Sequence, residues 1–295
     1  MSKSDCRKIL FGEGNLTIED IVNVSQSQDP VALSENKDFR NRIDAGVRFL
    51  DKILSEEGHI YGVTTGYGDS VMFEVPYDLV EELPMHLTRF HGCGLGDFFT
   101  PEQSRAILAT RLTSLTRGYS GVSWNLLDLL VELLNRNILP VIPQEGSVGA
   151  SGDLTPLSYV AGTLIGERDT YYKGEVVSAA VAFEQEQLTP IKLRPKEGLA
   201  IMNGTAVMTA LACTAYKRAE YAAKLMARIT ALSSLALKGN SNHFDDILFS
   251  VKPHPGQNRI AKWIQNDLNH HEHPRNSHRL QDRYSIRCAP HVIGV

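Results

Sequence analysis

Residues 197–237 read EGLAIMNGTAVMTALACTAYKRAEYAAKLMARITALSSLAL. The stretch is rich in alanine, leucine, methionine and threonine and has few helix-breaking residues, which predicts a long helix with a kink near Gly204. A helix of this length exceeds the usual size in globular domains and buries its apolar side chains among other helices. The sequence therefore predicts a mostly α protein built on a long-helix bundle.

The sequence before this stretch predicts shorter helices. Thr17 is a typical N-cap followed by acidic residues, and apolar residues recur at helical spacing between residues 38 and 54. A capping box at Thr100, with proline at the next position, starts another helix. Ser123 caps a further helix that runs to Asn137 and carries a leucine-rich face.

Non-helical segments separate these helices. Residues 61–68 read YGVTTGYG, and three glycines in this short stretch predict a loop. Two prolines hold residues 139–143 extended, and residues 172–177 predict a small hairpin, but no βαβ alternation or internal repeat is visible. We expect residues 1–195 to form an N-terminal region of short helices, loops and a hairpin, and residues 196–295 to begin the helical bundle.

The bulk composition excludes several classes of protein. The 295 residues carry a net charge of -4, which leaves no basic excess to hold nucleic acid or an anionic membrane. No apolar run is long enough to span a bilayer, and the first residues lack the apolar stretch of a signal peptide. Four scattered cysteines indicate neither a disulfide framework nor a zinc site. We expect a cytoplasmic protein with a small neutral or zwitterionic ligand.

The most unusual segment is residues 146–157, GSVGASGDLTPL. Taken alone, it is a glycine-rich turn in which Ser151 or Asp153 caps the helix that follows. The same segment can also cyclise: the nitrogen of Gly152 attacks the carbonyl carbon of Ala150, two waters leave, and the Ser151 side chain becomes an exocyclic methylene. Glycine lets the backbone fold back tightly enough for this attack.

The product of this cyclisation is 4-methylidene-imidazol-5-one (MIO). It is a strong electrophile, which no standard side chain provides. Because it forms autocatalytically from Ala150, Ser151 and Gly152, it requires no metal and no diffusible cofactor.

Five segments, in the same order, resemble the aromatic amino-acid ammonia-lyases, which act on histidine, phenylalanine or tyrosine. Residues 146–157 resemble the MIO signature of this family, and residues 61–68 resemble its catalytic tyrosine loop. Residues 87–94 resemble its substrate-selecting segment, residues 197–205 its asparagine motif, and residues 281–288 its arginine motif. The resemblance runs from about residue 10 to the end and implies the long-helix bundle of the histidine/phenylalanine ammonia-lyase type.

The resemblance implies an elimination, in which the amino group and a β-hydrogen leave an aromatic amino acid. Tyr61 resembles the general base, a role that needs nearby positive charge or hydrogen-bond donors because an ordinary tyrosine has a pKa of about 10. Asn203 resembles the residue that holds the substrate carboxylate and the MIO ring oxygen. Arg287 resembles the carboxylate clamp, and Tyr284 and Gln281 resemble pocket residues beside it.

Phe90 and His91 match the pair of positions that resembles the family's selectivity switch. Phenylalanine lyases tend to have Phe-Leu there, some tyrosine lyases have His-Leu, and histidine lyases and other tyrosine lyases have Ser-His. This chain has Phe-His at these positions, which is a mixture of those pairs. His91 can hydrogen-bond an imidazole or a phenolic hydroxyl, which disfavours phenylalanine and leaves histidine and tyrosine both open as substrates.

The family also implies an assembly larger than this chain. Family chains continue past the equivalent of Val295 and there supply further bundle helices and pocket residues, including a glutamate and a phenylalanine, so we expect this sequence to be a fragment. The family is homotetrameric, with active sites shared between subunits. We therefore expect Tyr284 and Arg287 to serve the site of a neighbouring copy.

Other interpretations compete with the lyase. Metal-ligand side chains cluster near the end of the chain, at His270, His271, Glu272, His273 and His278. They lack a helical His-Glu-x-x-His pattern, which favours a solvated loop. Ser151 lacks the spacing of a hydrolase nucleophile elbow, and the glycines at 92, 94 and 96 lack the context of a nucleotide-binding motif. The rival from another class is a truncated, non-catalytic scaffold or regulatory relative.

Overall fold

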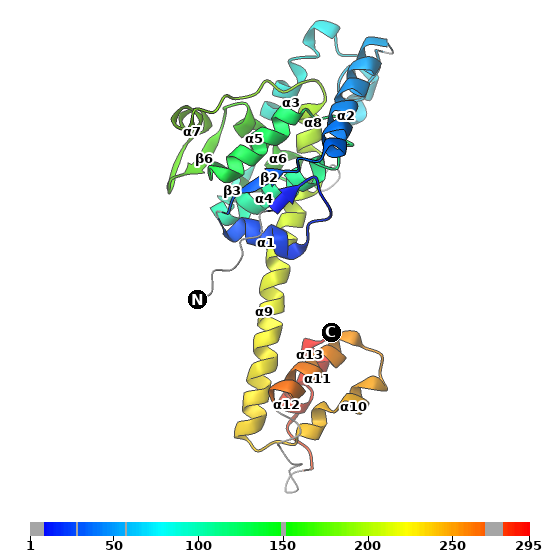
Figure 1. Cartoon of the computed structure of the whole chain (residues 1–295), viewed down its shortest axis with the longest axis vertical. Coiled ribbons are helices and arrows are strands. Elements are labelled where there is room, and N and C mark those ends of the chain that lie inside the picture. The colour runs from blue at the N-terminus through cyan, green and yellow to red at the C-terminus, as the bar shows by residue number, and fades with distance from the viewer. Residues whose placement is uncertain (1–8, 28, 57, 149–151, 269–279) are drawn as a thin grey trace. The chain divides into compact units, whose positions relative to one another are not determined.

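The computed structural model describes residues 9–27, 29–56, 58–148, 152–268 and 280–295. The chain divides into two compact units, Met1–Thr214 and Ala215–Val295. Helices dominate both units (Figure 1), which confirms the mostly α class and the bundle type expected from the sequence. The expected division into residues 1–195 and 196–295 stays a prediction.

The first unit contains most of the helices. They are α1 (Ile18–Gln26), α2 (Lys37–Glu56), α3 (Leu83–His91), α4 (Pro101–Leu115), α5 (Trp124–Asn135), α6 (Leu154–Leu164), α7 (Ala179–Glu186), α8 (Glu197–Met202) and the start of α9 (Ala206–Ala236). Two short 3-10 helices follow α2, namely η1 (Gly68–Met72) and η2 (Tyr77–Leu79). Among the helices in the described part of the chain, none has both the length and the apolar character needed to cross a membrane.

The predicted helix starts are confirmed. Thr17 and Thr100 each accept the backbone N–H three residues later, and each is part of a reciprocal capping box. Ser123 accepts the N–H of Leu126 at 3.4 Å in the same way. These side chains satisfy backbone N–H groups that have no intrahelical partner, so the helices begin where the sequence indicates.

Helix α6 lies at the centre of the first unit. Every residue from Thr155 to Leu164 is buried, as expected of a helix surrounded by protein on all sides. It packs against α3, α5 and α8. Because α6 begins directly after Asp153, the described residues Gly152 and Asp153 lead into the core.

Within the described ranges, the strands are short and form three small sheets. Their bounds are β1 (Ile9–Phe11), β2 (Val31–Leu33), β3 (Leu95–Phe98), β4 (Leu139–Pro140), β5 (Pro143–Glu145), β6 (Asp169–Tyr172) and β7 (Glu175–Ser178). The antiparallel β6–β7 pair confirms the predicted hairpin. The sequence showed no βαβ pattern, yet β1, α1 and β2 form one with parallel strands, because strands of three residues are too short to show alternation.

The predicted long helix is interrupted. Helices α8 and α9 are separated by residues 203–205, so the kink expected near Gly204 is a complete break. Gly204 has a φ of +142°, a conformation that residues with a side chain rarely adopt. Asn203 is the C-cap of α8 and therefore lies directly at this break.

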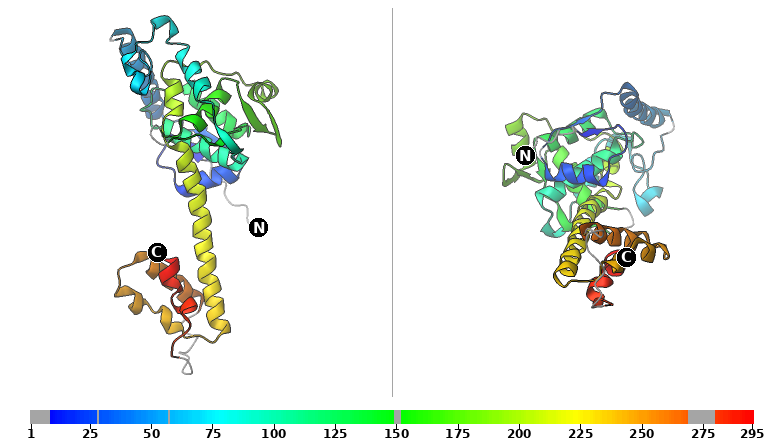
Figure 2. Two further views of the ribbon diagram at one scale, coloured as in Figure 1. Left: turned by 180° about the vertical axis from the view of Figure 1, so that it is seen from behind. Right: turned by 60° about the horizontal axis from the view of Figure 1, so that its bottom comes forward.

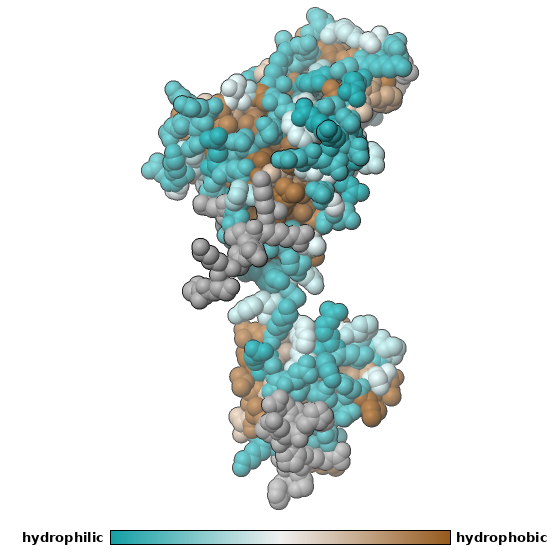
Figure 3. Space-filling model, in the orientation of Figure 1, coloured by the Kyte–Doolittle hydropathy of each residue, from teal (hydrophilic) through white to brown (hydrophobic). Residues whose placement is uncertain are grey.

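The second unit has its own small hydrophobic core. Figure 2 shows the helices of this unit in two further views. Besides the rest of α9 it contains η3 (Ser241–Phe244), α10 (Asp246–Ser250), α11 (Pro255–Asp267), α12 (Tyr284–Arg287) and α13 (Ala289–Ile293). Apolar surface remains exposed on this unit (Figure 3). One stripe of α9, with spacings of three and four residues, is between 46% and 68% exposed and consists of Tyr221, Leu225, Ile229 and Leu232.

Candidate active site

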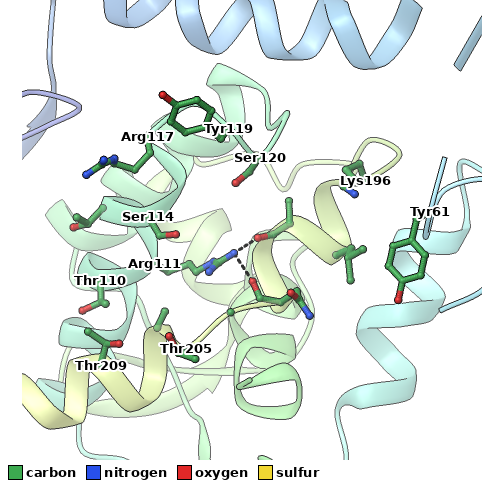
Figure 4. A pocket seen from close by; sticks show the side chains of 16 residues that line it. Tyr61, Thr110, Arg111, Ser114, Arg117, Tyr119, Ser120, Lys196, Thr205 and Thr209 are labelled. Atoms are coloured by element: carbon green, nitrogen blue, oxygen red, sulfur yellow. Dashed lines mark hydrogen bonds between the residues drawn. The ribbon is translucent and has the colours of Figure 1, made fainter. Parts of the chain in front are cut away.

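A pocket of about 820 Å³ lies beside the break between α8 and α9 (Figure 4). Side chains of α4 form one wall, and α8 with the first turn of α9 forms another. Tyr61 and Asn203, both expected from the sequence to be site residues, line this pocket together with Gly204. The structure therefore brings the tyrosine loop and the asparagine motif to one cavity.

The pocket is basic and rich in hydroxyl groups. Arg111, Arg117 and Lys196 line it, and none of the described lining residues is acidic. Burial lowers the pKa of Lys196 and lowers that of Arg111 to about 10. Positive charge in a partly buried pocket attracts anions, so this cavity suits the carboxylate of an amino acid.

Gly152 connects the predicted electrophile to this break. It has a φ of +74° and pairs with Gly204 in a short parallel bridge. A Cβ atom on Gly152 would overlap the carbonyl oxygen of Gly204, and the backbone N–H of Asp153 donates to that same oxygen at 2.7 Å. The Ser147 hydroxyl donates to the carbonyl oxygen of Gly152 at 2.9 Å. Only glycine fits at position 152, as the cyclised group requires of its third residue.

Tyr61 is held by its own loop. Its hydroxyl oxygen accepts the backbone N–H of Gly68 at 2.9 Å, and its ring meets the ring of Tyr67 edge-on with centroids 6.4 Å apart. The N–H donor stabilises negative charge on the phenol oxygen, which is useful for a base. Burial, with a smaller contribution from nearby Tyr61, raises the pKa of Tyr67, so that second tyrosine stays protonated.

Phe90 and His91 lie at the end of α3 and are not among the described residues that line this pocket. Phe90 is 80% exposed, and its ring contacts the ring of His91. Nδ1 of His91 lies 3.0 Å from the carbonyl oxygen of Leu87. A carbonyl only accepts, so the neutral ring carries its proton on Nδ1 and leaves Nε2 as an acceptor.

The arginine motif belongs to the second unit. Helix α12 carries Tyr284 and Arg287, and the guanidinium of Arg287 lies over the Tyr284 ring, 4.4 Å from its centroid. Tyr284 is 73% exposed, and Gln281 is exposed as well. The Nε atom of Arg287 is buried and has no hydrogen-bond partner within the described part of the chain.

The start of this motif is fixed by Asp282. The buried Asp282 carboxylate accepts the N–H of Asn240 at 2.8 Å, and the Asp282 N–H donates to Nε2 of His243 at 3.0 Å. Burial lowers the pKa of His243, Arg287 lowers it further, and Asp282 opposes both. His243 therefore accepts as a neutral ring.

Sequence reasoning missed Arg111. This residue of α4 donates hydrogen bonds to the carbonyl oxygens of Ala200 and Asn203, the latter at 3.0 Å (Figure 4). The sequence offered one signal, namely an arginine next to the apolar residues of this helix. In the structure Arg111 is only 4% exposed, and its neighbour Leu112 is fully buried. A charge in such a place usually has a defined partner.

Some expected residues lie outside the described ranges. Gly149, Ala150 and Ser151 are among them, as is the whole histidine cluster of residues 270–278. In the ranges that are described, no three metal-ligand side chains come together. The absence of a metal site and the cytoplasmic location stay predictions.

The sequence matches the aromatic amino acid lyase family over residues 16–295. It is 37% identical over 288 residues to the histidine ammonia-lyase of Homo sapiens, an alignment that covers 95% of this chain and 44% of the human protein. It is 36% identical over 291 residues to the histidine ammonia-lyase of Caldanaerobacter subterraneus, an alignment that covers 98% of this chain and 57% of that protein. The chain thus spans about half the length of the curated relatives it matches.

Solved structures give the same result. The tyrosine aminomutase of Streptomyces globisporus matches with a TM-score of 0.86 and 32% identity, over 97% of this chain and 58% of that one. The histidine ammonia-lyase of Trypanosoma cruzi matches with a TM-score of 0.84 and 30% identity, over 97% and 54%. The arrangement of motifs, the helical fold and these similarities lead to one conclusion: the chain belongs to the aromatic amino acid lyase family.

Proposed function

We propose that this chain carries the electrophile-forming part of an ammonia-lyase that removes ammonia from an aromatic L-amino acid. The observation that supports this most is the joint placement of Tyr61 and Asn203 on one basic pocket, at a break whose Gly204 abuts Gly152. The histidine ammonia-lyase relatives support the same reaction.

The chain's own residues have separate parts in the elimination. Tyr61 removes the β-hydrogen, and the N–H of Gly68 stabilises the charge on its phenol oxygen. Asn203, with the nearby cations Arg111 and Lys196, favours binding of the substrate carboxylate. The MIO group that we propose at residues 150–152 supplies an electrophile that activates the substrate for loss of its amine.

The substrate that we propose first is histidine, with tyrosine as the second candidate. The histidine ammonia-lyases of Homo sapiens and Caldanaerobacter subterraneus match over nearly the whole chain, at 37% and 36% identity, whereas the tyrosine aminomutase of Streptomyces globisporus matches at 32%. Nε2 of His91 is an acceptor, so it can take a hydrogen bond from an imidazole N–H or a phenol O–H. Phenylalanine has neither donor, and a polar group left unpaired disfavours its binding.

We infer that further copies of the chain complete the site in a homotetramer. The exposed stripe of Tyr221, Leu225, Ile229 and Leu232 favours burial against other helices. Arg287 would then clamp the carboxylate in the site of a neighbouring copy, beside Tyr284 and Gln281. Light scattering tests this inference: a stable tetramer supports it, and an active monomer contradicts it.

The test of the function begins with the mass of the peptide that contains residues 150–152. A peptide two waters lighter than its sequence supports the electrophile. Ammonia release from histidine, tyrosine and phenylalanine, measured on the same preparation, then tests turnover and substrate. A peptide of plain mass together with no turnover would instead favour a non-catalytic scaffold or regulatory relative.

The product distinguishes the lyase from an aminomutase, which the similarity to tyrosine aminomutase makes the second candidate. A lyase releases an α,β-unsaturated acid and ammonia, whereas an aminomutase returns the amino group to the same molecule. Release of ammonia in equal amount to the acid supports the lyase. An isomeric amino acid as the main product would instead support the aminomutase.

A further inference from the structure

Arg111 is a buried arginine whose guanidinium faces the break between α8 and α9. It donates hydrogen bonds to the carbonyl oxygens of Ala200 and Asn203, which belong to the end of α8 (Figure 4). The last carbonyls of a helix lack intrahelical partners, and a cation there also interacts favourably with the helix dipole. Arg111 thus fixes where α8 ends.

Gly204 is enclosed between Arg111 and Gly152. A Cβ atom on Gly204 would lie 2.6 Å from Nη1 of Arg111, and a Cβ atom on Gly152 would overlap the carbonyl oxygen of Gly204. The same oxygen accepts the N–H of Asp153. The guanidinium therefore limits the position of Gly204 on one side, and Gly204 limits the backbone of Gly152 on the other.

Asp153 adds a charge to this arrangement. Its carboxylate is 5% exposed and accepts the N–H of Met208 at 3.0 Å, in the first turn of α9. Burial lowers the pKa of Arg111 to about 10, and the charge of Asp153 opposes that fall, so Arg111 is charged at neutral pH. Helix α4, the start of α9 and the residue after the cyclising triad are joined in one network.

We propose that Arg111 is a positioning residue for the cyclisation of residues 150–152. The proposal rests on the proposed function, because it assumes that the electrophile forms. By holding Gly204, Arg111 restricts the backbone at Gly152, whose nitrogen must approach the Ala150 carbonyl carbon closely. A restricted approach of this kind is what makes an intramolecular attack fast.

The step balances without any other reactant. A bond forms between the Gly152 nitrogen and the Ala150 carbonyl carbon. The Ala150 oxygen leaves as water with the amide hydrogens of Ser151 and Gly152, while the Ser151 nitrogen forms a double bond to that carbon. The Ser151 hydroxyl leaves as the second water with the α-hydrogen of the same residue, which produces the methylene.

Arg105 offers a matched control on the same helix. It is 3% exposed, donates to the carbonyl oxygens of Val24 and Leu134, and has its pKa lowered by burial. Those carbonyls belong to α1 and α5, not to the break beside Gly204. Replacing Arg105 therefore removes a comparable buried cation without touching Gly204.

The experiment follows newly translated whole chains over time. Arg111→Met and Arg111→Lys are compared with Arg105→Met and Arg105→Lys and with the wild type. Circular dichroism records folding, and the mass of the peptide with residues 150–152 records the loss of two waters. We expect Arg111→Met to slow dehydration by about 10²-fold, because a small misplacement costs about that much in rate. Arg111→Lys should retain part of the dehydration rate, and the folded Arg105 variants should dehydrate at the wild-type rate.

Each result decides the proposal. Dehydration at the wild-type rate in folded Arg111→Met would overturn it, and so would equal slowing in the Arg105 variants. Unfolding of both Arg111 variants while the Arg105 variants fold would also overturn it, because Arg111 would then serve the fold as a whole. A wild-type peptide of plain mass would refute the electrophile itself, and with it the proposed function, before any variant is compared.

Discussion

The carbonyl oxygen of Gly204 accepts the backbone N–H of Asp153 at 2.7 Å, which joins the α8–α9 break to the residue after the proposed cyclising triad. The approach is so close that a side chain on Gly152 would collide with Gly204. Two glycines, far apart in sequence, therefore define how Gly152 and Asp153 lie against the asparagine motif. Replacing one of these glycines should therefore lower the stability of the chain.

Gly204→Ala should lower the free energy of unfolding by about 2–4 kcal/mol, since a strained backbone costs about 1–3 kcal/mol and the methyl group also displaces Arg111. Urea unfolding measures the loss. Gly174→Ala is the control: Gly174 has a φ of +85°, but a Cβ atom there meets nothing within 4 Å, so only the backbone strain remains. Equal losses in the two variants would show that Arg111 moves aside freely.

Tyr61→Phe should lower turnover by about 10²–10⁴-fold, the usual contribution of a general base. Stability should change by only about 1 kcal/mol, because one hydrogen bond to Gly68 is lost at a half-exposed site. Tyr67→Phe is the matched control, since Tyr67 lies in the same loop and contacts the Tyr61 ring. Ammonia release from the preferred substrate measures the turnover of both variants, and Tyr67→Phe should keep the turnover of the wild type. Wild-type turnover in Tyr61→Phe would mean that another group is the base.

Local signals in the sequence were enough for the helix starts and the hairpin. Thr17, Thr100 and Ser123 cap their helices through backbone groups within one turn, so the sequence around each residue contains the whole interaction. A kink near Gly204 was predicted for the same reason, as glycine at this place weakens a helix, although the structure has a complete break there. Family resemblance then supplied the candidate roles of Tyr61 and Asn203.

Contacts between distant segments were not predictable in this way. Arg111 bonds to carbonyls that lie 89 and 92 residues further along the chain, and no local pattern indicates which carbonyls at the end of α8 need a partner. The position of Phe90 and His91 relative to the pocket likewise depends on how α3 packs. Such features follow from tertiary structure, which the periodicity of a single segment does not encode.

His91→Leu should change the choice of substrate. It removes the Nε2 acceptor, so kcat/KM for histidine or tyrosine should fall about 10–100-fold relative to phenylalanine, equivalent to ~1–3 kcal/mol for an unpaired polar group. Competition assays with substrate pairs measure this ratio. His86→Leu is the control, because His86 is an exposed histidine of the same helix that has no part in the proposed site, and it should leave the ratio nearly unchanged. An unaltered ratio in His91→Leu would contradict the proposed contact.

The second unit contains a group that should make its stability depend on pH. Nε2 of His243 accepts the N–H of Asp282, and a protonated ring could not accept there. Burial and, to a smaller extent, Arg287 lower the pKa of His243 in the folded chain, although Asp282 opposes them. In the unfolded chain the ring takes up a proton at its ordinary pKa of about 6.5, so the unfolded state binds more protons below that value.

The contribution of His243 to the stability of this unit should therefore be constant above about pH 6.5 and fall as the pH decreases toward 5. Thermal unfolding of the chain at several pH values measures this slope. His243→Gln places a non-titrating acceptor near the same position and should flatten the slope in that window. His254→Gln, at an exposed position of the same unit, should leave the slope as in the wild type. If His243→Gln kept the wild-type slope, the acid sensitivity would come from another group, and the contact between His243 and Asp282 would not control it.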